Sequence, residues 1–487
     1  MTTAAAFLLV CWWAALSHAS VVRTPTVERS SATVHLAGAR SSFEPLELWV
    51  EAFNQQHNVR LQPASSPLSV DFRLQRMSTD DQGRDIIEDV VEEAEDGDLY
   101  EDPATGSVVM VDGSRRVEGV ITPTLSLRAA PDGTHEAVRQ HPAAVVAEAL
   151  IDDYLEVPHN VTRSGKSSRD GRGVVSVSPE VYVIVDSKLS AALGSNKKIK
   201  KYLSIFWNAV NQRFATMTDP KVNLVISGAL MIRNSAKEPF ITDNVLSQDY
   251  IDGTNTLSAV SDWLFEKRNK LPAYDIAYLM TGKDMADVES GVVRDGLAGI
   301  AWKGAACVVA MGNKRSFNTA MGEDKGAYYQ GVMIAAHEVA HNLGSPHDGN
   351  DGAESCSWDD GYIMSYVSGK ANKLFFSSCS QKLMKEYILT SSADCLHKTA
   401  VGAKIGLSSR LPGQIFSMDE QCQKITGESQ AFASKSVSDD SLCVKLVCQW
   451  KEKVGNSVWT YTSSSQRPAA EGSPCRGGGA CTNGSCK

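Results

Sequence analysis

The stretch Ala335–Gly349, AAHEVAHNLGSPHDG, is the part of the sequence that most restricts the fold. His337 and His341 stand four residues apart, so on a helix they lie on one face. Gly344 can end that helix because glycine adopts left-handed backbone dihedrals at little cost. The chain can then turn back and bring His347 beside the first two histidines. The sequence therefore predicts a helix, a reversal and three converging imidazoles.

Three imidazoles leave one position open on a tetrahedral zinc ion, which is typical of catalytic zinc sites. Zinc lowers the pKa of its bound water toward about 7 and polarises a carbonyl group. Glu338 follows His337 and is placed to accept the proton of the water and pass it to the leaving amine. These residues predict hydrolysis of a peptide bond without a covalent intermediate.

Two other interpretations of the motif are a polar face on an ordinary helix and a structural zinc site. The first requires HExxH, Gly344 and His347 to occur at fixed offsets by chance, which is improbable. The second requires a fourth protein ligand. Asp348 is the candidate, but its direct adjacency to His347 makes joint coordination awkward. We therefore favour a catalytic zinc site.

The N-terminus and the cysteines predict an exported protein. Residues 1–19 hold an apolar run followed by small residues, which is typical of a secretory signal peptide. The run is too short to be a membrane span. There are eleven cysteines; Cys11 lies in the signal and the other ten begin at Cys307. An even set in an exported chain predicts five disulfides, and no Cys-x-x-Cys pair supports the alternative of a zinc-thiolate cluster.

Charge divides the chain into two parts. Residues 1–172 carry 15 basic and 26 acidic side chains, whereas the remainder carries 33 and 31. The boundary lies in RSGKSSRDGRG, a composition typical of an exposed linker. Its RDGR sequence fits a minimal proprotein-convertase site, so we expect a cut after Arg172 that frees a propeptide, 20–172. A plain solvated linker is the alternative. The sequence has no block of basic residues of the kind that would indicate nucleic-acid binding.

After Gly173 the apolar pattern alternates between strands and helices, which predicts an α+β domain with helices packed on a mixed, mostly parallel sheet. Strands are expected at 181–185, 222–232, 275–281, 297–302 and 307–311, and helices at 196–217, 257–268, 328–343 and 378–390. The front part shows only short strand-like runs, at 33–36 and 108–111. The C-terminal part is loop-rich, and its six cysteines allow fifteen pairings.

The sequence HEVAHNLGSPHD has the HExxHxxGxxH form of the metzincin proteases. Asp348 after the third histidine resembles the adamalysin/reprolysin branch, which includes snake-venom metalloproteases and the ADAM and ADAMTS proteases. GYIMSY resembles the metzincin Met-turn and would place Met364 beneath the zinc ligands. The resemblance implies a zincin-like catalytic domain at 173–398. It also implies an edge strand within Gly296–Val308 that pairs with extended substrates.

Residues 410–487 resemble the disintegrin-like/cysteine-rich module of ADAMTS proteins, although that module normally has eight cysteines. No thrombospondin-type repeat follows, and this plan resembles the salivary reprolysin-type metalloproteases of ticks. The resemblance implies two disulfides in the catalytic domain, Cys307–Cys395 and Cys356–Cys379.

Glu180 and Asp275 match carboxylates that bind calcium in some relatives. Lys398 stands where a third calcium ligand is expected, which argues against a conventional calcium site. The alternative is that both are solvated or salt-bridged surface carboxylates. Asn160 and Asn483 lie in glycosylation sequons.

Propeptides of this family often close the zinc site with a free cysteine. GSVVMVDGSRRVEGVI, 106–121, resembles the region that holds it but contains none. Latency must therefore come from a histidine such as His135 or His141, from a carboxylate, or from steric cover.

Together these features predict a secreted zinc endopeptidase that is made as a proenzyme. Matrix proteins and fibrin(ogen) are the substrates that the resemblance implies. The alternative is an adhesion or binding protein that acts through its cysteine-rich module. All three histidines and Glu338 are present and no Arg-Gly-Asp occurs, which favours the enzyme.

Overall fold

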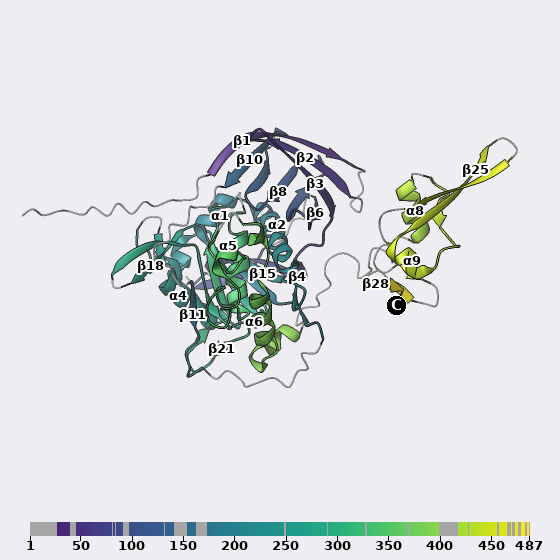
Figure 1. The fold of residues 1–487 in the computed structure, drawn as a ribbon. Helices are drawn as coiled ribbons and strands as arrows, with labels where there is room; N and C mark the ends of the chain where they lie inside the picture. The colour runs from purple at the N-terminus through teal and green to yellow at the C-terminus, as the bar shows by residue number, and fades with distance from the viewer. Residues whose placement is uncertain are drawn as a thin grey trace, which may run out of the picture.

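The computed structural model (Figure 1) describes residues 27–38, 45–79, 81–82, 84–90, 97–130, 132–140, 153–161, 173–247, 250–289, 291–326, 329–367, 370–398, 417–426, 428–454, 457–464, 469, 473–475, 479–482 and 485–486. The expected signal peptide, the expected cut after Arg172, His141 and the sequon asparagine Asn483 lie outside these ranges.

The front part forms a closed barrel of eight strands, drawn in purple and blue in Figure 1. In β2 (Leu46–Ala52) buried and more exposed residues alternate, as expected when one face of a strand packs inward. The barrel has its own apolar core, which includes Leu48, Leu61, Val109 and Ile121. Its other strands are β1 (Val27–Ala37), β3 (Gln55–Pro63), β6 (Asp98–Asp102), β7 (Ser107–Val111), β8 (Val117–Thr122), β9 (Leu125–Ala129) and β10 (His135–Gln140).

The second part is built on an eight-stranded sheet of order β11-β20-β23-β17-β13-β15-β4-β5. All neighbours are parallel except β20–β23 and β4–β5, so the predicted mixed, mostly parallel sheet is confirmed. Five of its strands come from the chain after Gly173: β13 (Glu180–Val185), β15 (Val225–Met231), β17 (Ile276–Thr281), β20 (Gly299–Lys303) and β23 (Thr319–Glu323).

Both edges of this sheet come from the front part of the chain. At one edge β11 (Tyr154–Glu156) pairs with β20, and at the other edge β4 (Leu68–Thr79) pairs with β15 and carries β5 (Asp85–Asp89). The charge boundary near Arg172 therefore does not separate two independent structural units. The front part contributes strands to both edges of the sheet.

Helices cover both faces of the sheet. On one face, α2 (Asn196–Phe214) and α5 (Val332–Asn342) share an apolar core with Val181, Val183 and Val185 of β13. The opposite face of β13, with Tyr182 and Ile184, packs with α4 (Gly253–Lys267). The other helical segments here are α1 (Ser187–Leu193), α3 (Pro239–Thr242), α6 (Ser378–Ile388) and the 3-10 turns η1 (Ser235–Lys237), η2 (Trp358–Asp360), η3 (Ala371–Leu374) and η4 (Ser391–His397).

Small strands complete this part. They are β12 (Ser176–Val177), β14 (Lys221–Val222), β16 (Tyr250–Asp252), β18 (Asp284–Glu289), β19 (Val292–Leu297), β21 (Val309–Ala310) and β22 (Arg315–Ser316). Among the described helices, none is long and apolar enough to cross a lipid bilayer.

The C-terminal module, yellow in Figure 1, is small and held by disulfides. Its bonds are Cys422–Cys448, Cys443–Cys481 and Cys475–Cys486, and several of these sulfurs form its buried core. With Cys307–Cys395 and Cys356–Cys379 this makes the expected five disulfides. The elements are α8 (Met418–Thr426), β24 (Phe432–Ala433), α9 (Asp439–Val444), β25 (Val447–Val454), β26 (Ser457–Ser464), β27 (Pro474–Cys475), β28 (Gly479–Thr482) and β29 (Ser485–Cys486).

Candidate metalloprotease active site

The helix α5 carries the first two histidines of the motif. It ends at Asn342 with Leu343 as the C-cap, and Gly344 follows with a φ of 100°, the left-handed conformation that the sequence predicts. A side chain at Gly344 would also collide with the Cβ of Tyr387, 2.6 Å from the position of an added Cβ. The reversal brings the imidazole of His347 back to those of His337 and His341.

The Nδ1 atoms of two histidines are fixed by backbone carbonyl groups. His337 Nδ1 donates to the carbonyl oxygen of Ile363 at 2.8 Å, and His341 Nδ1 donates to that of Ser345 at 2.7 Å. Because a carbonyl can only accept, each Nδ1 carries the proton and each Nε2 of a neutral ring presents a lone pair. Burial lowers the pKa of His341 to about 3, which keeps that ring neutral.

The three Nε2 atoms converge on one point. His337 Nε2 lies 3.0 Å from His341 Nε2 and 3.2 Å from His347 Nε2. Lone pairs that face one another at this distance repel unless a cation lies between them. Imidazole nitrogens in this arrangement are common zinc ligands. The donor set therefore fits zinc.

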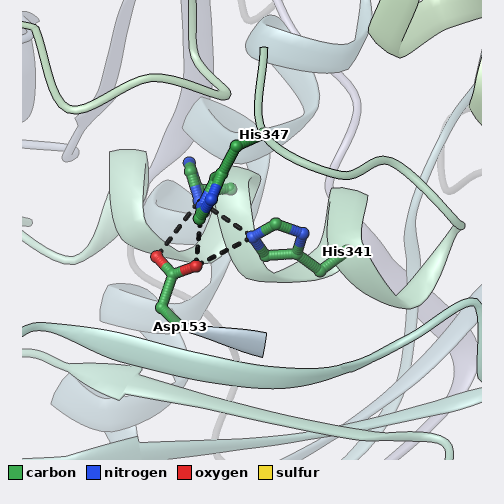
Figure 2. A group of neighbouring side chains, drawn as sticks. Asp153, His341 and His347 are labelled. Atoms are coloured by element: carbon green, nitrogen blue, oxygen red, sulfur yellow. Dashed lines mark hydrogen bonds and ion pairs between the residues drawn. The ribbon is translucent and has the colours of Figure 1, made fainter. Parts of the chain in front are cut away.

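A fourth group, Asp153, faces the same point. Its carboxylate oxygens lie 3.2 Å from His337 Nε2, 3.0 Å from His341 Nε2 and 2.8 Å from His347 Nε2. Figure 2 shows this carboxylate pointing at His341 and His347. Nothing in the sequence around Asp153 distinguishes it from other acidic residues of the front part.

Glu338 is almost fully buried beside this group. One of its oxygens, Oε2, has no hydrogen-bond partner among the described residues. Burial, and then the charge of Asp153, raises the pKa of Glu338 well above its usual value. A buried carboxylate with one oxygen that lacks a partner among the described residues is suited to proton transfer once a substrate and water enter.

Gly299, the first residue of β20, leaves room for Glu338. A Cβ added at Gly299 would lie 2.4 Å from Glu338 Oε1 and 2.7 Å from Cδ. We expect Gly299→Ala to displace this carboxylate and to lower kcat/KM of the processed protein about 100-fold, with bound zinc unchanged.

Steady-state peptide hydrolysis and zinc content measured on the same sample check this expectation. Gly312→Ala is the matched control, because a Cβ there meets no atom within 4 Å. Equal kcat/KM in the two variants would show that Gly299 does not position Glu338.

The segment that resembles a Met-turn makes backbone hydrogen bonds that fix the histidine motif. Met364 is fully buried, and its carbonyl oxygen accepts a hydrogen bond from the Asp348 N–H at 2.9 Å. The preceding carbonyl, that of Ile363, orients His337. Asp348 turns away from the histidines, since its Oδ1 accepts hydrogen bonds from Ser377 and Ser380 at the start of α6. Asp348 is thus occupied elsewhere and does not close a structural zinc site.

Glu180 and Asp275 lie together at the start of neighbouring strands, and both are buried. The Glu180 N–H donates to Asp275 Oδ2 at 3.0 Å, and burial raises the pKa of Asp275 to about 7. The alternative of solvated surface carboxylates is therefore wrong, because the two side chains are in the interior. A calcium site here stays a prediction. Asn160 is exposed, as a glycosylated residue must be.

Comparison with known proteins places this geometry in a family. Residues 179–376 match the model of the Metallo-peptidase family M12, reprolysin type, and residues 412–487 match ADAMTS cysteine-rich domain 2. Residues 179–376 are an M12 metallopeptidase domain. The M12 domain is a zinc metalloendopeptidase, and it is followed by an ADAMTS-type cysteine-rich domain.

Three curated proteins that are similar to this chain come from Bombyx mori, Tityus serrulatus and Olivierus martensii. One from Bombyx mori, called "A disintegrin and metalloproteinase with thrombospondin motifs like", is 29% identical over 90% of this chain and 72% of its own length. The venom metalloproteinase antarease TserMP_A of Tityus serrulatus is 27% identical over 64% of this chain and 83% of its own. The venom metalloproteinase BumaMPs1 of Olivierus martensii is 26% identical over 82% of this chain and 98% of its own.

Among solved structures, metalloproteinase-II from Bacteroides fragilis overlaps 69% of this chain and 90% of its own, with 10% identity and a TM-score of 0.35. A TM-score this low does not establish a shared fold.

Proposed function

We propose that this chain is a secreted zinc endopeptidase, made as a proenzyme, in which Glu338 is the general base. The observation that carries the proposal is the convergence of three imidazole Nε2 atoms beside a buried carboxylate whose Oε2 has no hydrogen-bond partner among the described residues. Such a constellation combines a metal ligand set with a group able to move a proton.

Zinc, when bound by His337, His341 and His347, polarises a peptide carbonyl and makes a water molecule more acidic. Glu338 then takes the proton from the attacking water and delivers it to the leaving nitrogen. Burial raises the pKa of Glu338, and a more basic carboxylate is better able to take a proton from water. One water molecule is added across the peptide bond, and Glu338 returns to its starting protonation state.

The edge of the sheet beside Glu338 is the natural place for an extended substrate. The Ala301 N–H of β20 already donates to a backbone carbonyl of the front part, that of Asp153, at 3.1 Å. A substrate backbone would use the same donor once that segment leaves. Recognition through the backbone gives affinity with little sequence preference.

Export is supported by the signal-like residues 1–19 and by five disulfides, which persist in oxidising compartments. A proprotein convertase cutting after Arg172 would begin activation. Extracellular proteins, including matrix proteins and fibrinogen, are the proposed substrate class, although fold similarity alone does not select substrates.

Cleavage-site profiling of an extracellular proteome tests the proposal. The processed enzyme should generate new N-termini that disappear with a zinc chelator and with Glu338→Ala. A processed, zinc-loaded protein that cleaves nothing would contradict the proposal and favour a binding role for the cysteine-rich domain.

A further inference from the structure

We infer that Asp153 is the group that keeps the zinc site closed in the uncut chain, by taking the fourth position on the metal. The inference rests on the proposed function, since it concerns regulation of the same site. It answers how a front segment without a cysteine between Trp12 and Ala306 can hold the enzyme latent.

The contacts of Asp153 are those of a metal ligand. Its two oxygens are shared among three Nε2 atoms, with Oδ1 facing His341 and His347 and Oδ2 facing His337. All four ligand atoms lie within 4.8 Å of one another. Carboxylate oxygen is one of the donor types that zinc accepts. Three imidazole nitrogens and a carboxylate that face one point form a donor set that fits a metal cation at the centre.

The backbone of Asp153 is anchored to the catalytic sheet. Its carbonyl oxygen accepts from the Ala301 N–H, and the next residues form β11, which runs parallel to β20. Asp153 therefore enters the site at the start of an added strand. The position of its carboxylate is set by strand register, with Tyr154 opposite Ala301.

The side chain of Tyr154 strengthens this placement. Its ring centroid lies 4.7 Å from that of His341 and 5.3 Å from that of His347. Its hydroxyl donates to Asp351 Oδ2 at 2.6 Å, and Lys303 Nζ lies 4.2 Å from its ring centroid. Tyr154 thus packs against two of the candidate zinc ligands.

Lys303 joins the two strands electrostatically. Its Nζ lies 2.6 Å from Glu156 and 2.9 Å from Asp351. Farther along, Val157 and Val161 are buried in the same apolar cluster as Trp302. Four kinds of contact therefore hold the segment 153–161 on the catalytic domain. They are the carboxylate at the histidines, the strand pairing, the ion pairs and the burial of apolar side chains.

One segment thus blocks both the metal and the substrate edge. Because Val161 precedes the expected cut after Arg172, that cut leaves Asp153 in place. The structure therefore separates two steps of activation, cleavage of the chain and departure of β11 from β20. The second step exposes the fourth zinc position.

Cobalt substitution tests the inference on the full chain. Every protein carries Glu338→Ala, so that no variant can cut itself, and Co²⁺ replaces zinc because its visible spectrum reports the ligand set. Asp153→Ala is compared with the parent, with Asp153→Asn as the isosteric variant. Glu156→Gln is the matched control, since Glu156 lies on the same strand but pairs with Lys303 and is not in the metal-binding group found among the described residues. Acetohydroxamate is titrated into each as a small metal-binding probe.

We expect Asp153→Ala to change the cobalt spectrum and to bind acetohydroxamate more tightly, by about 100-fold if Asp153 occupies the metal in about 99% of parent molecules. Asp153→Asn should shift in the same direction, and Glu156→Gln should match the parent. Added acetate should return the Asp153→Ala spectrum toward that of the parent.

Two results would overturn the inference. One is an unchanged spectrum and probe affinity in both Asp153 variants, with one metal per chain throughout. The other is an equal change in Glu156→Gln, which would mean that loosening the strand, and not losing a ligand, opens the site. In both cases the proposed function as a zinc enzyme would be unaffected. Failure of the parent to bind any metal would instead contradict the proposed function.

Discussion

Glu338→Ala is expected to abolish most proteolysis while leaving the fold and the zinc in place. Loss of a positioned general base lowers rates by about 10²–10⁴-fold. The fold should tolerate the change, because Glu338 Oε2 makes no hydrogen bond to a described residue and its burial disfavours the charged form. Removing a buried group of this kind takes away a desolvation cost along with the side chain.

The measurement is kcat/KM for a fluorogenic peptide, with zinc content and thermal unfolding recorded on the same processed sample. Glu386→Ala is the control, because that carboxylate is exposed on α6 and pairs only with Lys382 among the ion pairs found. If the Glu338→Ala enzyme cleaved the peptide at the parental rate, Glu338 would not be the general base.

His341→Ala is expected to lose both zinc and activity. The substitution removes one of the three nitrogen ligands, since His341 Nε2 lies 3.0 Å from His337 Nε2. A metal present at about 1,000 times its Kd stabilises the folded state by about 4 kcal/mol, so the variant should also unfold at a lower temperature. Chelation of the parent should produce a similar shift.

Zinc content and calorimetry of the processed protein provide the check. The control is His397→Ala, because His397 donates from Nε2 to the carbonyl oxygen of Ile388 and lies outside the metal set. Stoichiometric zinc in His341→Ala would mean that the metal is held by other residues.

The parts of this molecule that follow from local sequence could be predicted. The helix α5, its end at Gly344 and the return of His347 depend on spacing within fifteen residues of chain. The parallel sheet follows from buried strands such as β13. The start of α4 was placed too late, because Asp252 accepts a hydrogen bond from the Asn255 N–H and begins the helix before its apolar face.

Features that depend on distant residues could not be predicted. Asp153 lies 188 positions from His341 in sequence, and its role depends on the pairing of β11 with β20. The barrel was also missed, although β2 alternates clearly, since acidic residues on outward faces obscured the strands. The cysteine pairs of the C-terminal domain required the three-dimensional fold, because sequence permits every pairing.

The central claim is that three histidines hold a zinc ion on which peptide hydrolysis depends. The most direct test follows zinc content and peptide cleavage together in one processed sample, through removal of the metal by a chelator and its return in one equivalent. The account predicts one zinc per chain, activity that falls with the metal and activity that returns with it. Cleavage that persists at full rate in the metal-free protein would contradict the account.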